Sequence, residues 1–130
     1  MSVVIWSSAL ESGIMEIDER HRSFVGFINE LECPSANSPS ELDRILDAII
    51  DCSTYQFAFE EALLEGEGWH DLAAHRRAHE GFLVEMMRLR REMPMGLLDA
   101  ASLKAKLLRW LFDHIVCMDM VALNSLGASK

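Results

Sequence analysis

Prolines and glycines gather at three points of the sequence and divide it into four long segments. Two prolines bound the stretch 34–39, two glycines bound 66–68, and the third break holds Pro94 and Gly96. Each intervening segment has about 20–28 residues, which is too long for a strand and typical of a bundle helix. The sequence therefore predicts helices at residues 14–32, 39–65, 71–93 and 99–126.

Each segment has a seam whose positions recur at alternating steps of three and four. The seam of the first segment runs through Ile14, Ile17, His21, Phe24 and Ile28. This spacing lets one face pack against neighbouring helices at a shallow crossing angle. The chain has 130 residues, half of them apolar, which suits a single domain over residues 1–130. We expect an all-α protein, an antiparallel up-down-up-down four-helix bundle.

Two predicted helices have a recognisable start. Ser38 precedes Pro39 and has Glu41 three residues after it, which is the pattern of a capped helix N-terminus. Asp99 is placed to cap the last helix.

Charge and cysteine content exclude several classes of partner. The net charge of −9 argues against nucleic acid, because phosphate binding needs clustered Lys and Arg. No apolar run approaches the ~20 residues of a membrane span, and the N-terminus shows no secretion signal. Three cysteines without a Cys-x-x-Cys pair suit the reducing cytoplasm, where we expect the protein to reside. Oxygen and nitrogen atoms are therefore the metal ligands to expect.

Polar side chains interrupt the apolar seams of all four predicted helices. A buried polar group without a partner costs roughly 1–3 kcal/mol, and a whole domain has only about 5–15 kcal/mol of stability. These side chains must therefore satisfy one another or a bound group. They are His21, Gln56, His75, His79 and His114.

Acidic residues lie near these interruptions. Glu60 follows Gln56 by four residues and so shares its helix face, and His75 and His79 are also four apart. Several imidazoles together with two carboxylates indicate a two-metal site, and bridging carboxylates favour iron or manganese.

The second carboxylate is not fixed by spacing. Asp119 follows His114 by five residues, which places it about 140° around an ideal α-helix. Asp113, next to His114, is the competing candidate.

These residues resemble the hemerythrins, particularly the bacterial ones, over nearly the whole chain. The N-terminal segment and the first helix together carry Trp6, Leu10, Gly13-Ile14, Ile17-Asp18, His21-Arg22 and Ile28-Asn29. The second ends in Tyr55-Gln56-Phe57-Ala58-Phe59-Glu60-Glu61, where the family usually has His-Phe-x-x-Glu-Glu. Gly68-Trp69 leads to His75-x-x-x-His79-x-x-Phe82, and Trp110-Leu111-x-x-His114-Ile115 is followed by Asp119 at the family's spacing.

The resemblance implies two non-heme iron ions, bridged by Glu60, Asp119 and a solvent-derived oxygen, that bind dioxygen. It assigns one iron to three imidazoles and the other to His21, with an open position for dioxygen. Leu111 and Phe57 would form the apolar wall of that oxygen pocket. The three imidazoles are those of His75, His79 and His114.

Gln56 departs from the family pattern, because the family has a second histidine of the oxygen-binding iron there. Its amide oxygen is a weaker, harder ligand than imidazole, and the side chain could instead turn away and admit water. The alternative is a structural amide that is hydrogen-bonded to a neighbour.

Three functions fit this set of residues. The first is reversible dioxygen binding for sensing, delivery or storage, where a sensor would need a signalling partner or a fused domain in a longer parent protein. The second is a di-iron redox enzyme, an oxidase, a peroxidase or a nitric-oxide-handling centre. The third is a bundle that has lost its metal and serves as an interaction scaffold. We expect the first, with dioxygen as the partner.

Overall fold

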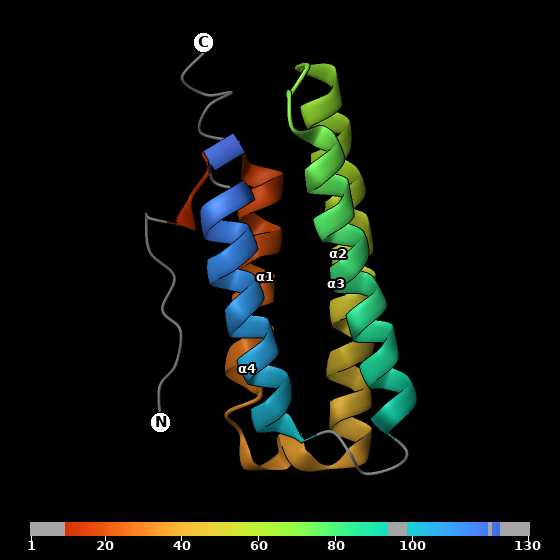
Figure 1. Cartoon of the computed structure of the whole chain (residues 1–130). Coiled ribbons are helices and arrows are strands. Elements are labelled where there is room, and N and C mark those ends of the chain that lie inside the picture. The colour runs from red at the N-terminus through yellow and green to blue at the C-terminus, as the bar shows by residue number, and fades with distance from the viewer. Residues whose placement is uncertain (1–9, 94–98, 120, 123–130) are drawn as a thin grey trace.

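The computed structural model describes residues 10–93, 99–119 and 121–122, and its helices form an antiparallel four-helix bundle. Figure 1 shows α1 beside α4 and α2 beside α3, with the chain passing up and down the bundle in sequence order. The helices are α1 (Met15–Glu30), α2 (Pro39–Gly66), α3 (Leu72–Glu92) and α4 (Ala100–Trp110), followed by η4 (Leu111–Asp119). The predicted fold is confirmed.

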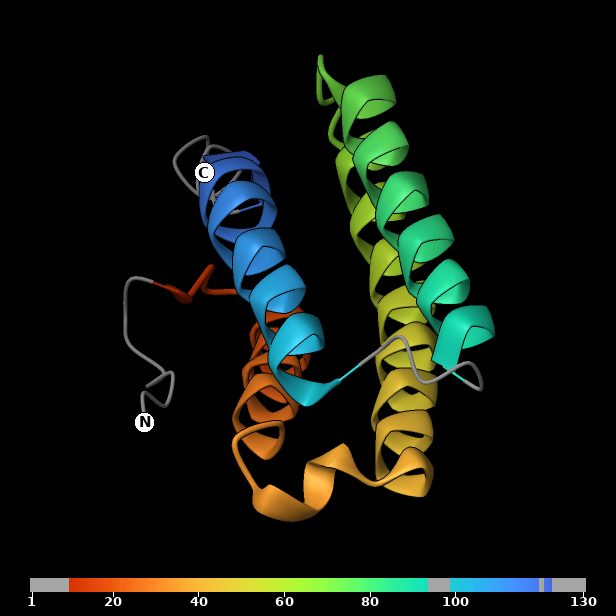
Figure 2. The same cartoon turned by 60° about the horizontal axis from the view of Figure 1, so that its bottom comes forward.

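Short connections place the helices next to their neighbours in sequence. A 3-10 helix, η2 (Pro34–Asn37), crosses the end of the bundle from α1 to α2 (Figure 2). At the opposite end Gly68, with φ of 68°, turns the chain from α2 into α3. That left-handed conformation carries little steric cost for glycine.

The expected caps are present. The Ser38 hydroxyl accepts a hydrogen bond from the backbone N–H of Glu41, and Pro39 occupies the first position of α2. The Asp99 carboxylate accepts a hydrogen bond of 2.7 Å from the N–H of Ser102. Both side chains thus pair backbone groups that a helix start leaves unsatisfied.

The fourth helix differs from the prediction. We expected one α-helix over residues 99–126, but the α-helix ends at Trp110 and residues 111–119 form the π-helix η4. A π-helix pairs residues five apart, so its turn is wider than that of an α-helix. Residues 123–126 and Trp6 lie outside the residues that the structure describes.

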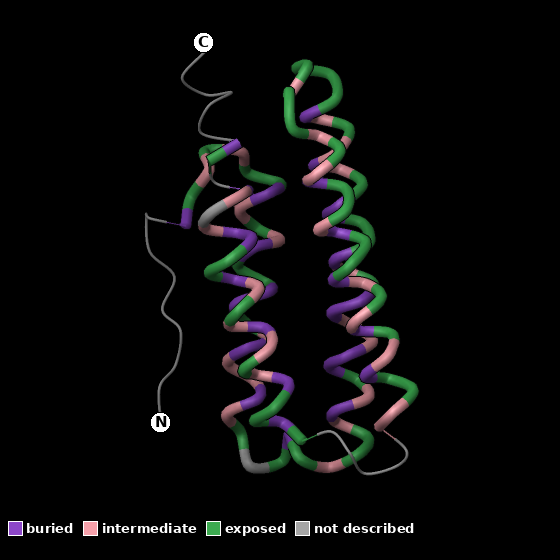
Figure 3. The backbone as a smooth tube through the Cα atoms, in the orientation of Figure 1, coloured by how far each residue is buried: buried purple, intermediate pink, exposed green. Residues whose placement is uncertain are grey.

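The inner faces of the helices form the core (Figure 3). Ile28 of α1, Ile49 of α2 and Leu107 of α4 are completely buried in it, as the seam spacing predicts. A smaller apolar cluster packs around Ile17, near the start of α1, and Leu64, near the end of α2. None of the helices in the described ranges is both long enough and apolar enough to cross a membrane.

Candidate metal centre

The bundle brings all seven candidate polar residues into its interior. α1 contributes His21, α2 contributes Gln56 and Glu60, α3 contributes His75 and His79, and η4 contributes His114 and Asp119. Their exposed fractions are 5% or less. The fifth histidine, His70, is exposed and contacts Trp69.

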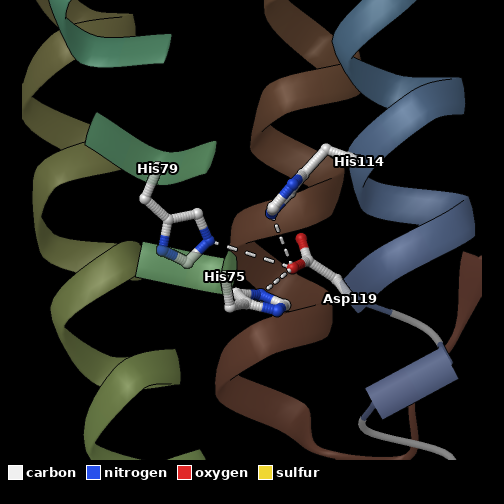
Figure 4. Close-up of side chains that lie close together, drawn as sticks. All are labelled: His75, His79, His114 and Asp119. Carbon is white, nitrogen blue, oxygen red and sulfur yellow. Dashed lines mark hydrogen bonds and ion pairs between the residues drawn. The ribbon is translucent and has the colours of Figure 1, made fainter. Parts of the chain in front are cut away.

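Three histidines surround one oxygen of Asp119 (Figure 4). Oδ1 of Asp119 lies 2.6 Å from Nε2 of His75, 2.9 Å from Nε2 of His114 and 3.9 Å from Nε2 of His79. The ligand atoms of these four residues lie within 4.8 Å of one another. This group offers three nitrogens and one oxygen to a metal ion, and we call it the three-histidine group.

A second group lies on the other side of Asp119. Oδ2 of Asp119 is 3.6 Å from Nε2 of His21, and Oε2 of Glu60 is 3.8 Å from the same nitrogen. Glu60 also faces the three-histidine group, since its Oε1 is 3.7 Å from Nε2 of His75. Each carboxylate therefore directs one oxygen toward each group, which is how a carboxylate lies when it bridges two ions. The one-histidine group is His21, Glu60 and Asp119.

The π-helix explains why the second carboxylate could not be chosen from spacing. In η4 the residues five apart return to the same face, so Asp119 lies beside His114. Asp113, the competing candidate, is exposed. The prediction from an ideal α-helix, that Asp119 points about 140° away from His114, is wrong for this segment.

The buried ligand atoms fit cations. Among the residues that the structure describes, five of these ligand atoms, one from each of five residues, have no hydrogen-bond partner. Leaving such groups unpaired costs about 1–3 kcal/mol each, so something must compensate them. They are Nε2 of His21, His79 and His114, Oε1 of Glu60 and Oδ2 of Asp119.

The two carboxylates also favour the protonated forms of two histidines, His21 and His75. Burial lowers the pKa of His21, but the nearby carboxylates of Asp119 and Glu60 outweigh burial and raise that pKa to about 9. The same balance raises the pKa of His75 to about 9. Burial raises the pKa of Asp119, yet the four histidines around it hold that pKa well below its usual value. Burial dominates at His114 and lowers its pKa. Metal ions at this cluster would replace the protons on His21 and His75.

Gln56 is buried and directs its amide nitrogen at Glu60. Nε2 of Gln56 donates a hydrogen bond of 2.6 Å to Oε2 of Glu60, as their spacing of four residues allows. This arrangement matches the interpretation of Gln56 as an amide that is hydrogen-bonded to a neighbour.

Aromatic rings cover two of the histidines. Phe57 stacks on His79 with ring centres 3.8 Å apart, and Trp110 stacks on His114 at 4.0 Å. Leu111 is buried in the same core cluster as Phe57. The structure thus places Phe57 beside the three-histidine group, and the assignment of Phe57 and Leu111 to a dioxygen pocket stays a prediction.

Sequence reasoning gave no role to Glu61. Its Oε2 lies 2.8 Å from Nδ1 of His79, on the side of the ring that faces away from Asp119. Seam spacing could not find this residue, because Glu61 is about 100° around the helix from Glu60. The pair of adjacent acids was the one available signal.

Comparison with known proteins identifies the relatives of the chain. Residues 12–125 match the family model described as the hemerythrin HHE cation binding domain. Over 116 residues the chain is 33% identical to bacteriohemerythrin from Stenotrophomonas maltophilia and 32% identical to that from Pseudomonas aeruginosa. Each of these alignments covers 88% of this chain and 76% of the relative. Among solved structures, wild-type hemerythrin superposes with a TM-score of 0.81 at 23% identity, covering 95% of this chain and 99% of that one.

Proposed function

Because the chain belongs to the hemerythrin family, we propose that it holds two iron ions in its buried cluster and binds dioxygen there. The observation that carries this proposal is the position of two carboxylates between three histidines on one side and His21 on the other. Oδ1 and Oδ2 of Asp119 face different groups, and so do Oε1 and Oε2 of Glu60. Mixed imidazole and carboxylate ligands on facing helices suit a pair of iron ions.

The two ligand groups would offer different numbers of ligands to their ions. The three-histidine group supplies His75, His79, His114 and one oxygen of Asp119, which is enough to fill most of an ion's coordination shell. The one-histidine group supplies a single imidazole and two carboxylate oxygens, so its ion would have room for an exogenous ligand. Two bound ferrous ions would supply the electrons that reversible dioxygen binding requires. Buried Phe57 and Leu111 would help to exclude water from the cluster.

The test of this function is an absorption spectrum of ferrous-loaded protein, recorded without oxygen and then in air. We expect a visible band that appears with oxygen and disappears when oxygen is removed. Direct, irreversible conversion to the fully ferric form would contradict oxygen carriage and would favour a redox enzyme. Turnover of peroxide with a reducing substrate would then identify that second function.

Gln56→His is expected to slow oxidation of the loaded protein in air by about tenfold. The added imidazole would complete the ligands of the more open ion and hold it more tightly. The decay of the ferrous state after mixing with air measures the rate.

Gln56→Ala is the matched control, because it removes the hydrogen bond to Glu60 without adding an imidazole. This control should oxidise at least as fast as the unmodified protein. An unchanged rate in Gln56→His would contradict the expectation that an imidazole at position 56 reaches the more open ion.

The cytoplasmic location stays a prediction from the sequence. Cys33 and Cys52 are free thiols, which suits the proposed cytoplasmic location. A sensor role, with a signalling partner or a fused domain, stays a prediction. A metal-free scaffold is a poor match, because it would keep five buried ligand atoms of the described residues unpaired.

A further inference from the structure

We propose that Glu61 is a positioning residue, which aims the imidazole of His79 at the metal site from outside the ligand cluster. The proposal rests on the di-iron function proposed above. Oε2 of Glu61 lies 2.8 Å from Nδ1 of His79. A carboxylate only accepts hydrogen bonds, so Nδ1 carries the hydrogen and Nε2 keeps its lone pair.

The free nitrogen faces the interior of the cluster. Nε2 of His79 lies 3.9 Å from Oδ1 of Asp119 and has no hydrogen-bond partner in the structure. Its lone pair therefore points at the place where the three-histidine group converges. The opposite tautomer would direct a hydrogen there and would prevent this nitrogen from binding a metal.

Two contacts together fix the ring. Phe57 stacks almost parallel to His79, with an angle of 4° between the ring planes, and so sets the plane of the imidazole. Glu61 sets the rotation of the ring within that plane, because its oxygen holds Nδ1. A ring that is constrained in both ways presents Nε2 in one direction.

Glu61 is itself held in place. Its other oxygen, Oε1, accepts a hydrogen bond of 3.2 Å from Nε of Arg76, one residue after His75 on α3. Only 23% of the Glu61 side chain is exposed, against 46% for Arg76. The acid is therefore a partly buried link between the exposed Arg76 and the ligand ring.

His79 differs in this respect from two other histidines of the cluster. Nδ1 of His21 and Nδ1 of His114 have no hydrogen-bond partner among the residues that the structure describes. Acceptors behind a ligand imidazole raise its basicity and fix its tautomer, and their loss commonly weakens metal binding about 10- to 100-fold. We therefore expect the loss of Glu61 to weaken the binding of one ion, the one held by the three-histidine group.

Ferrous iron affinity, measured without oxygen by competition with a chelator, tests the proposal. Glu61→Ala should bind one of the two ions about 10- to 100-fold more weakly and still take up two ions at saturation. Glu61→Gln should recover most of the affinity, because its amide oxygen also accepts from Nδ1. Glu80→Ala removes an exposed acid next to His79 in sequence and should match the unmodified protein.

Nitrogen NMR of the metal-free protein gives a second readout, which iron chemistry does not affect. The His79 ring should carry its hydrogen on Nδ1 in the unmodified protein and shift toward Nε2 in Glu61→Ala. Equal affinity and an equal tautomer in Glu61→Ala and Glu80→Ala would overturn the proposal, and so would a Gln variant as weak as the Ala variant. Failure of the unmodified protein to bind two irons would instead overturn the di-iron function.

Discussion

Replacing Asp119 with alanine is expected to reduce iron uptake from two ions per chain to at most one, bound at least about 100-fold more weakly. Asp119 is the residue that both ligand groups share. Its Oδ1 lies 2.6 Å from His75 and its Oδ2 lies 3.6 Å from His21, so one substitution removes a ligand from each ion. Iron content after anaerobic loading and desalting measures the effect.

Asp113→Ala is the matched control for this substitution. Asp113 lies in the same π-helix, but its side chain is exposed. The control should keep two irons per chain. Its loss of helical content, measured by circular dichroism, should be no larger than that of Asp119→Ala. Two tightly held irons in Asp119→Ala, or their loss in Asp113→Ala, would show that the acids were assigned to the wrong roles.

Removal of iron is expected to lower the melting temperature by about 10–20 °C at neutral pH. A ligand at 1,000 times its dissociation constant stabilises the fold by about 4 kcal/mol, and 1 kcal/mol shifts a domain of this size by several degrees. The physical cause is the set of five buried ligand atoms that lack partners among the described residues. Thermal unfolding before and after chelation, followed by circular dichroism, measures the difference.

This difference should widen between pH 7 and pH 9. In the metal-free protein the pKa values of His21 and His75 are raised from 6.5 to about 9 by Asp119 and Glu60, whose effect exceeds that of burial. Their contribution to stability is complete below pH 6.5 and is lost as the pH rises through about 9. In the loaded protein the ions replace these protons, and higher pH favours metal binding.

A metal-free protein that becomes more stable from pH 7 to pH 9 would contradict this electrostatic description. Equal melting temperatures with and without iron would contradict metal binding at the cluster itself. Melting curves of both forms at pH 7, 8 and 9 decide between these outcomes and the expected one.

The fold could be predicted from sequence spacing because a four-helix bundle depends on periodicity within each helix. Steps of three and four along each segment define one buried face, and the breaks leave room only for short connections. The same rule placed Gln56 beside Glu60, where the structure has a hydrogen bond of 2.6 Å. It also placed His75 beside His79, whose ring centres are 4.7 Å apart.

The candidate site could be predicted only in part from spacing along the helices. The pairing of Asp119 with His75 joins residues 44 positions apart, and α-helical periodicity says nothing about contacts between helices. Asp119 also lies in a π-helix, so the α-helical rule placed it on the wrong face. Glu61 lies outside the seam, and only the position of α3 against α2 brings it to His79.

Anomalous diffraction at the iron absorption edge, from crystals of iron-loaded protein, tests the central claim most directly. We predict two iron peaks within the bundle, one beside His75, His79 and His114 and the other beside His21, with the carboxylates of Glu60 and Asp119 between them. A single peak, or iron located away from these side chains, would contradict the claim.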